Sequence, residues 1–139
     1  MKTVEATPQR VQQFAGAVKP DAPVIMLNLL RYRAQASFPP GSADAPCSGR
    51  EAYRRYAAKA LACVQAAGGR PLFGGKVAAL PIAPDDEHWD DMLLVEYPSP
   101  QAFLQMVGSP EYRAVAHLRT AALEDSRLIA IQGDNSFQL

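Results

Sequence analysis

The sequence has little that would bind nucleic acid or cross a membrane. Its 139 residues include 14 Lys+Arg and 14 Asp+Glu, so no basic surplus is available to neutralise a phosphate backbone. The longest apolar run, residues 24–30, is interrupted by Asn28 and is far too short to span a bilayer. The first ten residues lack the apolar core of a signal peptide. These absences predict a cytoplasmic protein with no nucleic-acid or membrane partner.

Metal-binding and catalytic motifs are also missing. Cys47 and Cys63 form neither a CxxC motif nor a Cys/His pair, so a zinc site or a disulfide framework is not expected. The acidic residues within 85–91 lack the spacing of a calcium-binding loop. The sequence contains no Walker loop, G-x-G-x-x-G, H-E-x-x-H or G-x-S-x-G motif. We therefore expect no metal and no cofactor.

The sequence does contain clear signals for helices and strands. Its length and its 48% hydrophobic content suit one compact domain. Thr7 before Pro8 predicts the start of a short helix, which stops before Pro20. The apolar run that follows predicts a strand covered on both faces. Residues 34–48 have no periodicity and are rich in Pro, Ala and Ser, so they predict a long mobile loop.

The longest predicted helix follows this loop. Ser48 and Glu51 match the S-x-x-E pattern of a helix start, and the glycines at 68–69 end the helix. Tyr53 and Tyr56 fall on its inward stripe. Strands are predicted over residues 72–80 and 92–97, as a hairpin in which the glycines 74–75 indicate a bulge or a close backbone approach, and over residues 127–132. Ser-Pro pairs at 99–100 and 109–110 begin two short helices between the last two strands.

The resulting order, βαββαβ, is that of the ferredoxin-like α+β fold. In this fold an antiparallel four-stranded sheet carries both helices on one face and leaves the other face open. Because the first strand is apolar on both sides, we expect a second copy of the sheet to cover the open face. The predicted partner is therefore the protein itself, as a homodimer that pairs sheet to sheet.

Three stretches of sequence carry a family resemblance. They contain the patterns A-Y-x-x-Y, G-G, Y-P-S and S-P-E-Y followed by an arginine. Over residues 23–133 the chain resembles domain-of-unknown-function family 1330 (DUF1330), whose members are similar to dimeric α/β-barrel proteins. We expect residues 1–22 to be a helical extension, residues 23–133 to be one dimeric α/β-barrel domain and residues 134–139 to be a tail. The motif positions are Asn28, Tyr53, Tyr56, Gly68, Gly69, Trp89, Tyr97, Ser99, Tyr112 and Arg119.

Arg119 is the first candidate for a binding or catalytic residue. A helical wheel over residues 109–125 places it in the middle of an apolar face. A buried guanidinium must meet a carboxylate, several carbonyls or an anionic ligand. An ion pair with Glu96 is the obvious carboxylate alternative, and a clamp on a ligand carboxylate or enolate is the functional one. The rest of that face is Tyr112, Val115, Ala116, Leu118, Ala122 and Leu123.

Other polar and aromatic residues complete the predicted site. Asn28 is the one polar side chain in the apolar run 24–30, where it can orient a substrate carbonyl, bond to a neighbouring backbone group or bond to its dimer mate. Tyr56 can donate to an oxyanion, and Tyr53 and Tyr112 are expected beside it as ligand-binding residues, or as core residues. Trp89 is expected at a cleft mouth or in the dimer interface. His117, also predicted as a ligand contact, falls on the outward side of the wheel.

These residues favour a homodimer that binds a small anionic or aromatic metabolite in a cleft between the sheet and the helices. The resemblance to dimeric α/β barrels implies a range of activities, among them cofactor-independent monooxygenases, lactone isomerases, haem-degrading enzymes and stress-related proteins. If the protein is an enzyme, the residues could support proton transfer, with Arg119 and Asn28 polarising a carbonyl and Tyr56 or a histidine moving the proton. A non-catalytic dimeric module and a haem-handling enzyme are the alternatives.

Overall fold

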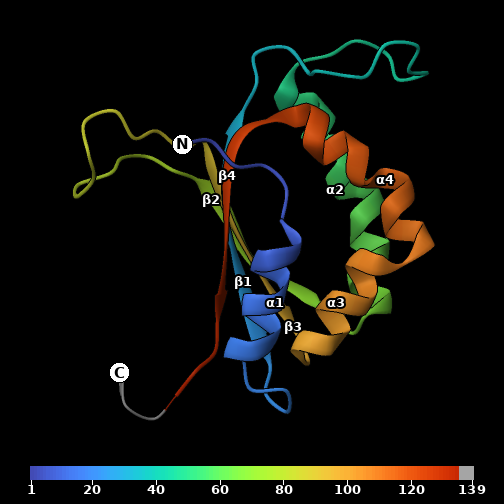
Figure 1. The fold of residues 1–139 in the computed structure, drawn as a ribbon. Coiled ribbons are helices and arrows are strands. Elements are labelled where there is room, and N and C mark those ends of the chain that lie inside the picture. Colours follow the sequence, from blue (N-terminus) through green and yellow to red (C-terminus); the bar gives the residue numbers. More distant parts are fainter. Residues whose placement is uncertain (135–139) are drawn as a thin grey trace.

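The computed structural model describes residues 1–134 as a four-stranded antiparallel sheet with helices on one face (Figure 1). The strand order is β2-β3-β1-β4, so β1 lies in the interior of the sheet between β3 and β4. This is the predicted ferredoxin-like arrangement, with one helix added before the first strand. The strands are β1 (Val24–Tyr32), β2 (Arg70–Lys76), β3 (Asp91–Tyr97) and β4 (Leu123–Ile131); the helices are α1 (Pro8–Ala17), α2 (Gly49–Ala66), α3 (Pro100–Gly108) and α4 (Pro110–Ala122).

The predicted helix starts are confirmed. Each helix follows a Ser or Thr whose side-chain oxygen accepts a hydrogen bond from the backbone N–H three residues later, at 3.1–3.2 Å. Gly68 ends the α2 segment with a φ of +77°, a conformation that glycine adopts without strain. The four capping residues are Thr7, Ser48, Ser99 and Ser109.

The limits predicted for the second strand are wrong. This strand covers residues 70–76 rather than 72–80, because β3 begins at Asp91 and offers no partner beyond Lys76. The chain then leaves the sheet, and the N–H of Val77 donates to the carbonyl of Asp90 at 2.9 Å. The pairing irregularity lies between Pro71 and Phe73, not at the glycines 74–75.

The last strand starts four residues earlier than predicted, at Leu123 rather than at 127. It follows α4 directly, with no turn residue between them. The carbonyls of Ala121 and Ala122 accept hydrogen bonds at 2.9 Å from the backbone N–H groups of Ser37 and Arg33. Because the loop after β1 satisfies these helix-end carbonyls, α4 ends without the glycine that usually marks such a position.

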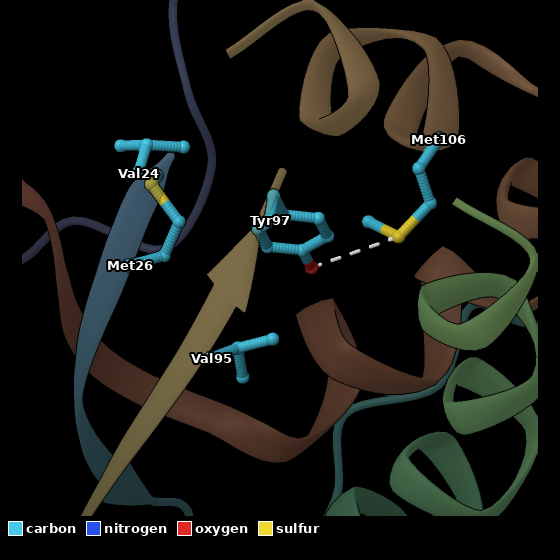
Figure 2. Close-up of a cluster of buried hydrophobic side chains, with 5 residues drawn as sticks. All are labelled: Val24, Met26, Val95, Tyr97 and Met106. Carbon is cyan, nitrogen blue, oxygen red and sulfur yellow. Dashed lines mark hydrogen bonds between the residues drawn. The ribbon is translucent and has the colours of Figure 1, made fainter. Parts of the chain in front are cut away.

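The core lies between the sheet and the helices, in two hydrophobic clusters along β1. One contains Val24, Met26, Val95, Tyr97 and Met106, where the Tyr97 hydroxyl donates to the Met106 sulfur at 3.6 Å (Figure 2). The side chains of β1 that face the helices alternate with half-buried ones, as expected for a strand. The second cluster contains Leu30, Ala52, Tyr53, Ala122 and Leu123.

The opposite face of the sheet carries apolar side chains that no helix within residues 1–134 covers. Phe73 on β2 is 61% exposed, and Ile129 and Ile131 on β4 are 44% and 40% exposed. The register places Ile129 opposite Leu27 and Phe73 opposite Leu94, so these residues share one face. Among residues 1–134, therefore, helices cover only one face of β1 (Figure 1).

The segment 34–48 contains neither helix nor strand, as predicted. Its mobility stays a prediction, although backbone and side-chain hydrogen bonds hold it in place. The N–H of Ala36 donates to the carbonyl of Cys47 at 2.9 Å, and Arg55 of α2 donates to the carbonyl of Ala45 at 3.0 Å. Within residues 1–134, every helix is too short or too polar to span a bilayer.

Candidate functional site

Three of the predicted tyrosines come together on the helix side of the sheet. Tyr53 and Tyr56 lie three residues apart on α2, and their ring centroids are 5.2 Å apart. Tyr56 also packs edge-on against Tyr112 of α4 at 6.1 Å, and the two hydroxyl oxygens are 2.8 Å apart. We call Tyr53, Tyr56 and Tyr112 the tyrosine cluster; it joins α2 to α4 through aromatic contacts and a hydrogen bond.

Burial keeps two hydroxyls of this cluster, those of Tyr53 and Tyr56, protonated. It raises the pKa of Tyr53 above the ordinary value, and the positive charge of Arg119 partly opposes the rise. Burial also raises the pKa of Tyr56, and the neighbouring Tyr112 adds to this effect. These hydroxyls therefore stay protonated at neutral pH. They can donate hydrogen bonds to a ligand oxygen, but they cannot accept a proton as bases.

Arg119 is half-buried beside the tyrosine cluster, and its partner is a backbone carbonyl rather than Glu96. Its Nη1 donates to the backbone carbonyl of Val4 at 2.7 Å. The suggested ion pair with Glu96 is wrong, because the register places Glu96 on the open face, opposite Ile25. There the Glu96 carboxylate accepts from Arg70 at 3.1 Å. Among the described residues, no carboxylate forms an ion pair with Arg119.

Val4 belongs to a segment that the sequence does not connect with the site. Residues 1–6, which we call the N-terminal strap, run beside the start of β4 before the chain enters α1 (Figure 1). Val4 is half-buried and packs against the second hydrophobic cluster. Its contact with Arg119 joins residues 115 positions apart, and no local pattern in the sequence predicts such a contact.

Asn28 lies on the face of β1 that points toward the helices, and it is only 8% exposed. Along the strand it falls between Met26 of the first cluster and Leu30 of the second. Its Nδ2 donates to the backbone carbonyls of Met26 and Leu93, both at 3.4 Å. These long bonds match the alternative of backbone hydrogen bonding, and a role for Asn28 in orienting a ligand stays a prediction.

Trp89 lies apart from the tyrosine cluster, at the end of the connection between β2 and β3. It is 5% exposed, and the guanidinium of Arg127 lies over its ring at 5.1 Å from the centroid. Together with Arg50, Lys76 and His88 it lines a half-open cavity of about 300 Å³. The predicted contact of Trp89 with a ligand stays a prediction. If Trp89 contacts a ligand, this cavity is where it would do so, away from the tyrosine cluster.

His117 lies on the exposed side of α4, as the wheel predicts. Its Nε2 is 3.0 Å from a carboxylate oxygen of Asp44 in the 34–48 loop. With Glu5, Ser37 and Thr120 it lines a second half-open cavity, of about 310 Å³. The structure does not bring His117 to the tyrosine cluster, so its predicted role as a ligand contact there stays a prediction without a supporting contact.

One aromatic residue of the site was missed. The Tyr32 ring lies 5.6 Å from that of Tyr53, and this contact extends the tyrosine cluster toward the end of β1. Its hydroxyl donates to Asp91 at 2.7 Å, and the same carboxylate oxygen accepts from Arg50 at 2.9 Å. Strand alternation from Leu30 to Tyr32 was the available signal, because both residues point toward the helices.

The described residues do not provide a metal site. Across residues 1–134, no group of three or more His, Cys, Asp or Glu side chains is placed to hold a metal ion. The arrangement instead offers a half-buried guanidinium, a row of protonated phenols and apolar side chains between a sheet and two helices.

The fold and this site define a ferredoxin-like α+β protein with its candidate site between sheet and helices. The model of the family Domain of unknown function (DUF1330) matches residues 44–134. The chain belongs to the DUF1330 family. The match begins after β1, so Asn28 lies outside it, whereas the tyrosine cluster and Arg119 lie inside it.

Solved structures share the fold of this chain. RPA0582, a protein of unknown function from Rhodopseudomonas palustris, is 34% identical, with 97% of this chain and 99% of that chain covered and a TM-score of 0.87. A hydroxynitrile lyase from Passiflora edulis is 15% identical, covers 86% of this chain and 100% of its own, and has a TM-score of 0.61. A dabb family protein with a ferredoxin-like fold from Mesorhizobium loti is 12% identical, with 78% and 94% covered and a TM-score of 0.50. The last two share the fold alone. No curated protein matches this chain.

Proposed function

We propose that the protein binds a small anionic or aromatic metabolite between its sheet and helices, with Arg119 as the anchor. The observation that carries this proposal is the half-buried Arg119 guanidinium, whose partner is the carbonyl of Val4. A guanidinium stays charged at every physiological pH, and a neutral carbonyl does not neutralise it. An anionic ligand would supply the opposite charge that the described residues around Arg119 lack.

The tyrosine cluster indicates which chemical groups the ligand would carry. Tyrosine faces pack against aromatic or apolar groups, and protonated hydroxyls donate hydrogen bonds to oxygen. The planar guanidinium fits a carboxylate in two parallel hydrogen bonds. A carboxylate attached to an aromatic or apolar body therefore suits the site, and we use benzoate as the probe.

Binding has stronger support than proton transfer. The raised pKa of Tyr56 makes it a hydrogen-bond donor to a carbonyl rather than a base. The two histidines of the chain lie elsewhere, His88 beside Asp90 and His117 beside Asp44. If the protein is an isomerase or a cofactor-independent monooxygenase, polarisation of a carbonyl by Arg119 is the step that this site supplies. A haem-handling role lacks support, because His117 is held on the exposed side of α4.

Thermal unfolding with benzoate tests this function. We expect millimolar benzoate to raise the Tm of the wild-type protein, since a ligand that binds the native state stabilises it by mass action. Benzyl alcohol, which has the ring without the charge, should raise it less. Arg119→Met should remove the benzoate effect and cost about 1 kcal/mol of stability, the value of one hydrogen bond.

Arg113→Met provides the matched control, because Arg113 is an exposed arginine on the same helix. It should keep the response to benzoate. An Arg119→Met protein that responds to benzoate like the wild type would contradict the assigned site.

The open face of the sheet supports a homodimer, which we propose as the working form. Phe73, Ile129 and Ile131 form an exposed apolar surface on the face opposite the helices. A second copy of the same sheet would bury this surface by two-fold symmetry. Sedimentation should then give twice the 15.0 kDa mass of one chain. A dimer with no response to any carboxylate would favour the second candidate, a non-catalytic dimeric module.

A further inference from the structure

We infer that the N-terminal strap is a displaceable lid that fills the ligand site with its own Val4, and that the ligand is a small monocarboxylate with an apolar body. This inference rests on the proposed function, because it takes Arg119 as the anchor. The strap holds the place of the ligand, which must displace it to bind.

Val4 presents the two chemical groups that such a ligand would present. Its side chain packs against the second hydrophobic cluster, which contains Tyr53 and Leu30. Its carbonyl oxygen accepts from Arg119 at 2.7 Å. One residue thus places an apolar group in the core and an acceptor oxygen on the guanidinium. A carboxylate would make the stronger, charge-assisted bond at the same nitrogen.

The strap is held mainly by polar contacts of Thr3 with the start of β4. The N–H of Thr3 donates to Asp125 at 2.9 Å, and its hydroxyl donates to the carbonyl of Ser126 at 2.7 Å. The carbonyl of Thr3 accepts from the N–H of Ser126 at 2.7 Å, and Arg127 donates to the Thr3 hydroxyl at 2.9 Å. Thr3 is exposed, whereas its partners Asp125 and Ser126 are buried, so water can replace these bonds only when the strap opens.

The strap buries little apolar surface. Met1 is fully exposed, residues 2, 3, 5 and 6 are exposed, and Val4 alone is half-buried. Segments with few buried apolar contacts and solvent-accessible hydrogen bonds open at low free-energy cost. The strap therefore has the contacts expected of a segment that opens without global unfolding.

The helix that follows the strap has its own anchors. Phe14 of α1 packs edge-on against Phe103 of α3 at 5.7 Å and belongs to the surroundings of the first hydrophobic cluster. Thr7 caps α1 independently of the strap, through the N–H of Arg10. Residues 5 and 6 lie between these two sets of contacts and are exposed. The strap can therefore move away from the core by rotation at residues 5 and 6, while α1 keeps its contacts.

Two threonines provide a matched pair of variants for the test. Thr3→Val keeps the size of the side chain but removes the hydroxyl bonds that hold the strap. We expect this variant to bind benzoate about 5-fold more tightly in calorimetry, because a larger open fraction raises the apparent affinity. Thr7→Val removes one hydroxyl bond at the α1 cap and none that holds the strap. Its affinity for benzoate should stay within about a factor of two of wild type, because the fraction of molecules with an open strap does not change.

Hydrogen exchange in the wild-type chain gives a second readout that does not depend on variants. Benzoate should increase the exchange of the Thr3 and Ser126 amides, which are protected by strap hydrogen bonds. Benzyl alcohol, at the same concentration, should leave this exchange unchanged.

The outcomes distinguish failure of the lid proposal from failure of the proposed binding function. If benzoate binds through Arg119 but Thr3→Val binds it equally or more weakly, and amide exchange stays unchanged, the lid is overturned and the proposed function stands. If benzoate binds to neither the wild type nor Thr3→Val, both are overturned. Equal gains in affinity for Thr3→Val and Thr7→Val would also overturn the lid, because they would reflect general loosening of the fold.

Discussion

At the scale of single residues, the contact between the Tyr56 and Tyr112 hydroxyls joins two helices inside the candidate site. Each hydroxyl oxygen lies 2.8 Å from the other, and both side chains are largely shielded from water. A buried hydroxyl without a partner costs more than a hydroxyl that is absent. The pair therefore stabilises the protein only when both members are present.

Tyr56→Phe and Tyr112→Phe test this coupling. Each single variant should lose about 1 kcal/mol of unfolding free energy, since it leaves one hydroxyl unpaired. The double variant should be no less stable than either single variant, because no unpaired hydroxyl remains. Urea unfolding of the four proteins measures the cycle. Additive losses would show that the hydroxyls have other partners.

Residue-level prediction placed the inward side chains correctly and allowed for the backbone partners of Asn28, but it did not identify the partner of Arg119. The helical period predicted the inward position of Arg119 and the shared stripe of Tyr53 and Tyr56, and the structure brings these residues together. The acceptor for Arg119 came instead from the backbone of Val4, 115 residues away. The hydrophobic period of a sequence describes one helix or strand at a time, so it cannot predict a contact with a backbone group in a distant segment.

At the scale of elements, the start of α2 meets both the end of β1 and the end of α4. Gly49 lies at this junction, and its N–H donates to the carbonyl of Arg33 at 3.1 Å. A Cβ at this position would clash with the backbone carbonyl oxygens of Arg33 and Ala122. Backbone atoms of three elements would have to move to make room for it, so close packing explains the glycine here.

Gly49→Ala should therefore destabilise the protein by about 3 kcal/mol or more. Gly16→Ala is the matched control: Gly16 lies in α1, and a Cβ there would meet nothing within 4 Å. This control should gain about 0.5–1 kcal/mol, because alanine is the better helix former. Thermal and urea unfolding measure both changes, and a Gly49→Ala protein as stable as the wild type would contradict the clash.

The elements that sequence patterns predicted well are those with local start and stop signals. Ser48, Ser99 and Ser109 each mark a helix start because the capping bond forms within three residues. The start of β4 was missed because α4 runs into it without a turn residue. The carbonyls at that helix end are satisfied by the 33–37 segment, so the signal lies in another part of the chain. Tertiary hydrogen bonds thus take the place of the local stop residues, such as glycine, on which prediction of a helix end depends.

At the scale of the whole molecule, the proposed dimer makes a prediction about the open face. Ile129 is 44% exposed and lies opposite Leu27 in the register. Ile129→Glu should convert the sedimenting species from the dimer mass to the monomer mass, because it would bury a charge in the apolar contact. The fold itself should survive, since this side chain does not face the helices.

Val11→Glu is the control for this experiment. Val11 is 39% exposed on α1, on the helix side of the sheet, so its replacement should leave the dimer mass unchanged. A wild-type protein that sediments at 15.0 kDa, or an Ile129→Glu protein that stays dimeric, would contradict pairing through the open face.

The interior place of β1 in the sheet also decides when the protein can finish folding. β1 pairs with β4, and β4 is synthesised only after β2 and β3. The strap adds contacts between residues 122 positions apart. Such long-range pairing is slow, and until β4 arrives one edge of β1 stays open to other chains. During synthesis, this apolar edge would be the segment that a chaperone has most reason to protect.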